Sequence, residues 1–159
     1  MNNGLSQSAR NVQEALASLG VDCQVVELSD STRTAREAAA AIGCGVEQIV
    51  KSLVFRGKQS DRGILVIASG SNRVNEKILA VLAGEPVEKA DADFVREKTG
   101  YAIGGVPPLA HRFPLLTFID QDLLNYGKIW AAAGTPYSVF SLTPADLQLM
   151  TDGQVVKIN

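Results

Sequence analysis

Histidine and cysteine are scarce in this sequence. One histidine and two cysteines occur among 159 residues, and Cys23 and Cys44 do not form a C-x-x-C pair. A zinc site needs several cysteine or histidine ligands at short spacings, and a disulfide-built fold needs a richer set of cysteines. The scarcity therefore argues against both. We expect two free, buried thiols and no bound metal.

Long apolar runs, strong positive charge and nucleotide-binding fingerprints are also missing. No stretch approaches the ~18 apolar residues of a membrane span, and the start, MNNGLSQSARNVQEAL, lacks the pattern of a signal peptide. A net charge of -2 argues against a surface built throughout to hold nucleic acid. Neither a P-loop nor G-x-G-x-x-G occurs. We expect a cytoplasmic protein with no cofactor, no membrane contact and no DNA partner.

Hydrophobic spacing and capping residues predict the secondary structure. Apolar residues recur at helical spacing over 5–19, and a capping-box pattern from Thr34 to Glu37 precedes a helix that Gly43 ends. A residue among Ser71, Asn72 and Asn75 caps a helix ending at Gly84, Asp91 caps a helix ending at Gly100, and Pro144 lies in the first turn of a helix over 143–150. Strands are expected at 23–28, 52–55, 64–68, 115–120, 128–134, 137–142 and 154–158.

This order of elements mixes helices with both adjacent and separated strands. Strict alternation of strand and helix fails at the hairpin expected between 52–55 and 64–68. The pattern indicates the α+β class with a mixed sheet. No repeat or linker divides the chain, and its length suits one core, so we expect a single domain over residues 1–159.

Lys51 is the first candidate site residue. It interrupts EQIVKSLVF where a short helical turn gives way to an apolar strand. One interpretation is a lysine that packs its stem and keeps its charge in water. The functional interpretation is a cation at the mouth of a site, able to hold a phosphate or a carboxylate.

The second candidate is the glycine-proline loop, residues 104–108, with the sequence GGVPP. Gly104 and Gly105 supply free backbone, and Pro107 and Pro108 fix φ beside them. The loop could serve only as a rigid connection. Adjacent glycines also permit close approach of a ligand and leave N–H groups to hold a carbonyl oxygen.

Three polar residues near this loop have ordinary structural explanations. His111 could act as a general base, but no partner nucleophile is evident, and a hydrogen-bonded loop residue is the commoner role. Asp120 and Asp122 could pair as acid and base. Asp120 also stands where a strand ends and a helix begins, which favours a cap.

Five segments together resemble the YbaK/prolyl-tRNA synthetase-associated editing domain family. They are VEQIVKSLVFRG, LVIASGSNRVNEKIL, GYAIGGVPPLAH, TFIDQDLL and IWAAAGTPYSVFSLTPADL. Their order and spacing match from about residue 23 to 158. The resemblance implies an α+β domain whose mixed, mostly antiparallel sheet is surrounded by helices. It also implies metal-independent hydrolysis of misacylated aminoacyl-tRNA in the free-standing, trans-acting form. Aminoacyl-tRNA is thus the expected partner, and the need for an aminoacyl-tRNA synthetase as a further partner stays open.

The resemblance also implies roles for particular residues. The lysine matching Lys51 anchors the terminal adenosine of tRNA through its phosphate, and the loop matching residues 104–108 holds the aminoacyl carbonyl, so backbone N–H groups of Gly104 and Gly105 would stabilise an oxyanion. Water, helped by a ribose hydroxyl of the substrate, would attack the ester. The predicted catalytic residues are Lys51, Gly104 and Gly105, and the predicted substrate-binding residues are Ser52, Val106, Pro107, Pro108, His111, Thr135 and Ser138.

The sequence departs from the family pattern in ways that bear on selectivity. Ser52 follows the lysine where relatives often have asparagine or threonine, and Ala110 precedes His111 where glycine is frequent. Some relatives use a histidine in a later strand to recognise the aminoacyl group; here Thr135 and Ser138 are the polar candidates. Two other hypotheses stay open: a non-catalytic module that binds tRNA or a synthetase, and a small-molecule hydrolase that uses His111 with an aspartate.

Overall fold

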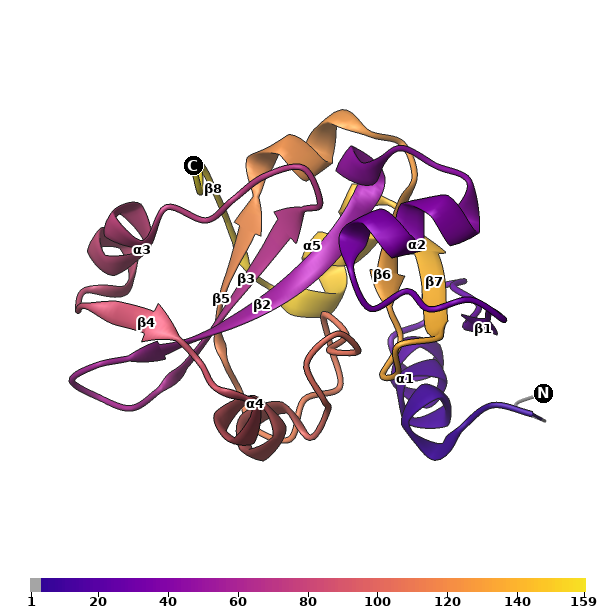
Figure 1. Ribbon diagram of the computed structural model, residues 1–159, viewed down its shortest axis with the longest axis horizontal. Coiled ribbons are helices and arrows are strands. Elements are labelled where there is room, and N and C mark those ends of the chain that lie inside the picture. Colours follow the sequence, from indigo (N-terminus) through magenta and orange to yellow (C-terminus); the bar gives the residue numbers. More distant parts are fainter. Residues whose placement is uncertain (1–3) are drawn as a thin grey trace.

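The computed structural model describes residues 4–159 (Figure 1). The predicted domain begins at residue 1, and residues 1–3 lie outside the described residues. The helices are α1 (Gln7–Ser18), α2 (Ala35–Ile42), α3 (Glu76–Ala83), α4 (Ala92–Thr99) and α5 (Pro144–Thr151), with 3-10 turns η1 (Val46–Gln48) and η2 (Gln121–Asn125). The strands are β1 (Val26–Glu27), β2 (Ile49–Gly57), β3 (Gly63–Ser69), β4 (Val87–Lys89), β5 (Leu116–Asp120), β6 (Ile129–Ala132), β7 (Ser138–Leu142) and β8 (Gln154–Val156). Within residues 4–159, no helix has the length and apolar character needed to cross a bilayer.

All of these strands belong to one mixed sheet with the order β1-β7-β6-β2-β3-β5-β8, and β4 pairs with β2 outside this path. The pairs β1–β7, β2–β3, β2–β4 and β6–β7 are antiparallel, whereas β2–β6, β3–β5 and β5–β8 are parallel. The sheet is therefore mixed and mostly antiparallel. The α+β fold expected from the sequence is confirmed.

Helices cover both faces of the sheet, and β3 lies buried between them (Figure 1). Leu65 and Ile67 of β3 pack with residues of α1, α4 and α5, whereas Ile64 and Val66 pack with α3 on the opposite face. This alternation follows from the two-residue period of a strand. A strand buried on both faces reads as a continuous apolar run, which the sequence of β3 does.

Side-chain caps fix the helix starts as predicted. Thr34 accepts from the N–H of Glu37, Asp91 accepts from Phe94, and Asn75, one of three predicted candidates, caps α3. Each of these caps satisfies a backbone donor that has no partner inside the helix. The predicted cap residues are confirmed, and of the capping box predicted from Thr34 to Glu37 the bond to the Thr34 side chain forms.

The strand predictions differ from the structure most clearly in three places. The strand expected over 52–55 is longer, because β2 runs over Ile49–Gly57. The strand expected over 23–28 is reduced to β1, because the side chain of Gln13 takes the hydrogen bonds of the preceding backbone: its Nε2 donates to Cys23 O and its Oε1 accepts from Val25 N. The short strand β4 was not predicted. With three residues it is too short to show a strand period.

Candidate functional site

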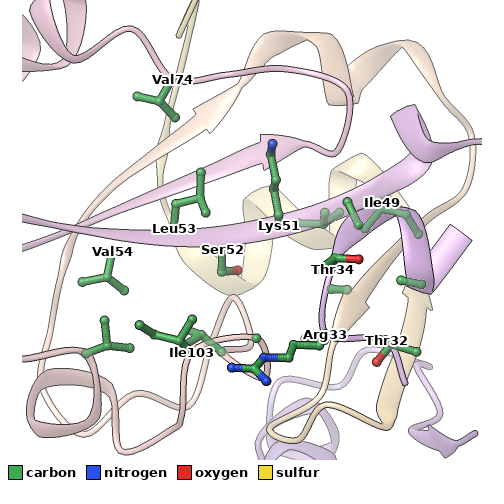
Figure 2. Close-up of a pocket in the computed structure, with 18 of the residues that line it drawn as sticks. Thr32, Arg33, Thr34, Ile49, Lys51, Ser52, Leu53, Val54, Val74 and Ile103 are labelled. Atoms are coloured by element: carbon green, nitrogen blue, oxygen red, sulfur yellow. The ribbon is translucent and has the colours of Figure 1, made fainter. Parts of the chain in front are cut away.

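A cavity of about 730 Å³ lies beside β2. It is bounded by the segment before α2, by β2, by the segment between β3 and α3, and by the glycine-proline loop (Figure 2). The residues that line it include Arg33, Lys51, Ser52, Arg73, Ile103, Gly104 and Val106. The cavity thus joins the two candidate regions that the sequence analysis singled out.

The cavity lies at an unpaired stretch of β2. The pairing of β2 with β6 covers Ile49 and Val50, and its pairing with β4 covers Phe55–Gly57. Residues 51–53 lie between these two pairings and have no strand partner on that edge among residues 4–159. We call residues 51–53 the open edge of β2. Backbone polar groups along such an edge are available to a ligand.

The open edge presents different side chains to the two faces of the sheet. Lys51 points to the face that carries α3, together with Leu53 and Val74, whereas Ser52 points to the opposite face, toward Ile103 and Arg33 (Figure 2). Successive residues of a strand alternate in this way. The cavity reaches both faces, so a ligand that crosses the open edge can touch both sets of side chains.

Lys51 is half-buried, and its surroundings alter its acidity. Burial lowers the pKa of its ammonium, the positive charge of Arg73 lowers it further, and the carboxylate of Asp120 opposes both effects. Lys51 makes no salt bridge among the described residues. A partly desolvated cation beside a second cation is arranged to receive an anion.

Asp120 holds the segment that carries Arg73. Its buried carboxylate accepts from the Ser69 N–H at 3.0 Å, from Asn72 Nδ2 at 2.8 Å and from the Asp122 N–H at 3.0 Å. The last contact is the cap that the sequence predicted. Neither Asp120 nor Asp122 lines the cavity. The role of these two aspartates is therefore to hold the backbone of this segment in place, not to act as an acid-base pair.

Within the glycine-proline loop, the two glycines have different backbone surroundings. Gly104 has φ +90°, which an L side chain rarely adopts, and its N–H has no acceptor among residues 4–159. The Gly105 N–H donates to Ala102 O at 3.0 Å, and Gly105 O accepts from the Gly134 N–H at 2.9 Å. A Cβ on Gly105 would lie 2.9 Å from Thr135 Cα. Gly104 faces the cavity, and Gly105 packs behind it.

His111 braces the same loop. Its Nε2 lies 2.7 Å from Pro107 O, and Tyr101 Oη donates to Ala110 O at 3.0 Å. Burial lowers the pKa of His111, partly offset by the hydrogen bond to Pro107. These contacts give His111 the hydrogen-bonded loop role, and it does not line the cavity.

The structure thus divides the predicted site residues into two groups. Those that line the cavity are Lys51, Ser52, Gly104 and Val106, and those that lie behind the lining are Gly105, Pro107, Pro108, His111, Thr135 and Ser138. Thr135 Oγ1 and Ser138 Oγ lie 2.6 Å apart and hydrogen-bond to each other. The two side chains that the sequence offered as polar pocket groups therefore satisfy one another outside the cavity.

Arg33 is a cavity residue that the sequence analysis missed. A Cβ on Gly104 would lie 2.6 Å from Arg33 Cγ, so the arginine stem lies directly against the glycine. Local sequence gives no signal for this contact, because only the tertiary fold brings residues 33 and 104 together. Among residues 4–159, no group of three or more histidine, cysteine, aspartate or glutamate side chains could hold a metal ion.

Comparisons with known proteins identify the family. The model of the aminoacyl-tRNA editing domain matches residues 29–149. An uncharacterised protein of Bacillus subtilis, YwhH, is 30% identical over 140 residues, which is 88% of each chain. The proline–tRNA ligase of Thermosipho melanesiensis is 32% identical over 80 residues, which is 50% of this chain and 14% of the ligase.

A solved structure extends the likeness to the whole fold. A protein provisionally described as a trans-editing enzyme for prolyl-tRNA synthetase is 48% identical, with a TM-score of 0.92, covering 98% of this chain and 99% of the other. The cavity of the present chain thus lies in a fold shared along almost its full length with that protein. The chain belongs to the aminoacyl-tRNA editing domain family.

Proposed function

We propose that this protein is a trans-acting aminoacyl-tRNA deacylase, which hydrolyses the ester of a misacylated tRNA. One observation carries the proposal: a single cavity contains both the half-buried cation Lys51 and Gly104, whose N–H has no acceptor among residues 4–159. The first suits a phosphate, and the second suits a carbonyl oxygen. Aminoacyl-tRNA carries both groups at its 3′ end. The compartment of translation, the cytoplasm, is the proposed place of action.

The free-standing form is supported by the share of each relative's length that this chain matches. YwhH and the solved relative match this chain over most of their own lengths, whereas the matched part of the proline–tRNA ligase is a small share of that enzyme. A domain that occurs both alone and inside a synthetase suits action on tRNA released by a synthetase. We propose residues 1–159 as one such domain, with aminoacyl-tRNA as its substrate and a synthetase as a possible source of it.

The substrate would cross the open edge of β2. On the face that carries α3, Lys51 would bind the phosphate of the terminal adenosine, with Arg73 beside it. On the other face, Ser52 and Val106 would contact the aminoacyl group, and the Gly104 N–H would donate to its carbonyl oxygen. The two roles are separated by the strand itself. Such positioning from both sides raises the effective concentration of the ester at the donor.

The other predicted residues would act on the loop rather than on the ester. Gly105, Pro107 and Pro108 shape and stiffen the loop, and His111 ties its carbonyl to the following segment. Preorganised donors stabilise a developing oxyanion without rearranging during the reaction. The loop framework therefore supports catalysis through the position of Gly104.

Aminoacyl selection would follow from size. The aminoacyl face of the cavity is lined by small apolar side chains, among them Val54, Val106 and Ala131. Rejection of one extra methylene by packing gives only about 1–3 kcal/mol. On the proline-accepting tRNA, we therefore expect the ester of a small noncognate amino acid to be hydrolysed faster than the ester of proline.

The test is deacylation of the proline-accepting tRNA after it has been charged with alanine, cysteine, serine, threonine or proline. Wild type, Lys51→Ala and the control Lys58→Ala are compared; Lys58 is exposed on the β2–β3 turn, outside the cavity. We expect one noncognate ester to be hydrolysed by wild type and by Lys58→Ala, and at least 100-fold more slowly by Lys51→Ala. Hydrolysis of no ester, with tRNA still bound, would instead favour the non-catalytic binding module.

A further inference from the structure

The proposed oxyanion site has only one backbone donor ready for use. The Gly104 N–H has no acceptor among residues 4–159, but the Gly105 N–H already donates to Ala102 O at 3.0 Å. A tetrahedral oxyanion is usually held by two or more preorganised donors. Recruiting Gly105 would break the turn that shapes the loop. A second donor from the protein would therefore come from another part of the cavity.

The side chain of Arg33 lies at the required place. Its Cγ occupies the space where a Cβ on Gly104 would stand, at 2.6 Å, and Arg33 Cβ would be 3.6 Å from the same point. From this contact the side chain extends across the cavity on the side of Ser52 and Ile103 (Figure 2). The guanidinium is thus on the aminoacyl face of β2.

The backbone at Arg33 is held by hydrogen bonds, whereas its guanidinium has no acidic partner among residues 4–159. The preceding residue, Thr32, is buried and makes two hydrogen bonds to Pro136 O, from its N–H at 2.6 Å and from its Oγ1 at 2.8 Å. The Arg33 N–H donates to Ser31 Oγ at 3.2 Å. Arg33 takes part in no salt bridge among the described residues. Arg33 is exposed, its backbone is held, and its guanidinium has no acidic partner among residues 4–159, so the guanidinium is available for a substrate anion.

We propose that the Arg33 guanidinium is the second donor to the oxyanion, and hence a catalytic residue. This inference rests on the proposed function. The oxygen of water forms a bond to the ester carbon, and the electron pair of the C=O bond moves to the carbonyl oxygen, which Arg33 and the Gly104 N–H hold. One proton of water passes to solvent by way of the ribose hydroxyl. The C=O bond then re-forms, the bond to the ribose oxygen breaks, and that oxygen takes a proton, leaving a free amino acid and deacylated tRNA.

The position of Arg33 separates it from the proposed phosphate site. Lys51 points to the face of β2 that carries α3, and Arg33 lies on the other face (Figure 2). Two cations on opposite sides of one strand can contact two different groups of one substrate. The phosphate and the ester carbonyl are the two groups of an aminoacyl-adenosine end that need such partners.

The experiment compares Arg33→Met, Arg33→Lys and the control Arg112→Met. Methionine keeps an apolar stem against Gly104, and Arg112 is exposed outside the cavity. For the ester that wild type hydrolyses, we expect Arg33→Met to lower kcat about 10²–10³-fold with KM within about threefold. Arg33→Lys should recover only part of this loss, because lysine keeps the charge but not the planar fork. A rise in KM with unchanged kcat would overturn the proposal and assign Arg33 to tRNA binding.

A binding measurement tests Arg33 separately from turnover. The probes are adenosine 3′-(1-aminoethyl)phosphonate, which is tetrahedral and anionic, and the planar amide of alanine with 3′-amino-3′-deoxyadenosine. By calorimetry, Arg33→Met should weaken phosphonate binding about 100-fold and leave amide binding unchanged. An equal loss for both probes, or for neither, would overturn the assignment. If wild type hydrolyses no ester, the proposed function fails, and the phosphonate preference still decides whether Arg33 holds a tetrahedral anion.

Discussion

His111 Nε2 lies 2.7 Å from the carbonyl oxygen of Pro107, so the only histidine of the chain closes the loop that carries Gly104. At this distance a ring N–H donates to the carbonyl, which requires a proton on Nε2 but no charge on the ring. Burial lowers the pKa of His111, which favours the neutral form in the folded protein. The histidine therefore links loop geometry to pH.

The first prediction concerns stability at acid pH. Because the folded-state pKa of His111 is depressed, its contribution to the free energy of unfolding is fully present above the ordinary value of about 6.5 and is lost as pH falls through the depressed pKa. At pH 8, His111→Gln should lower the free energy of unfolding by about 1 kcal/mol through the altered hydrogen bond. The difference from wild type should shrink between pH 7 and pH 5 in urea titrations. A difference that is constant over this range would contradict the depressed pKa.

The second prediction concerns Gly104. Alanine at this position would have to adopt φ +90° and would meet Arg33 Cγ at 2.6 Å, so Gly104→Ala should lower deacylation at least 100-fold by displacing the donor. Gly127→Ala is the matched control, since Gly127 has no atom within 4 Å of an added Cβ and no positive φ. It should retain wild-type activity. Equal activity of the two variants would remove Gly104 from the site.

Features decided by neighbouring residues could be predicted from the sequence. Thr34, Asp91 and Asp120 cap helices through donors two or three residues away, so the signal for each cap is contained in a few letters. The change from a helical turn to an apolar strand just before Lys51 and the stiffness of residues 104–108 are equally local. These local signals identified both candidate regions of the site, Lys51 and the glycine-proline loop.

Features decided by contacts between distant segments could not be predicted. Arg33 lies against Gly104, and Gln13 replaces a strand partner for residues 23–25, through packing that no local pattern encodes. The turn bond that occupies the Gly105 N–H depends on the path of the folded loop. For the same reason, the sequence could not show that Thr135 and Ser138 bond to each other rather than face the cavity.

The third prediction concerns the acidity of Lys51. Burial and then the charge of Arg73 lower the pKa of its ammonium, so neutral, reactive amine forms at lower pH than for an ordinary lysine. Labelling with an amine-reactive acyl reagent, followed by mass spectrometry, should give a midpoint for Lys51 below pH 10.5. Arg73→Met should raise this midpoint, because one lowering cause is removed. An unchanged midpoint would show that the charge of Arg73 does not reach Lys51.

The fourth prediction compares two serines of the candidate site. Ser52 Oγ is buried without a hydrogen-bond partner, the only such side-chain nitrogen or oxygen found in residues 4–159, whereas the buried Ser138 Oγ bonds to Thr135 Oγ1 at 2.6 Å. A buried, unpaired hydroxyl is unfavourable by about 1–3 kcal/mol, and a paired one contributes about 0.5–1.5 kcal/mol. Ser52→Ala should therefore raise the free energy of unfolding by about 1 kcal/mol, and Ser138→Ala should lower it by about the same amount.

Urea denaturation of the two variants beside wild type measures both changes, and deacylation assays on the same samples connect them to the site. Ser52 lies on the open edge of β2, where a hydroxyl without a partner is expected if it serves a ligand rather than the fold. A variant that is more stable and less active would show that the hydroxyl is kept for the substrate. If Ser52→Ala instead lowers the free energy of unfolding, the Ser52 hydroxyl has a hydrogen-bond partner in solution. Ser52 would then not be a group kept unpaired for a ligand.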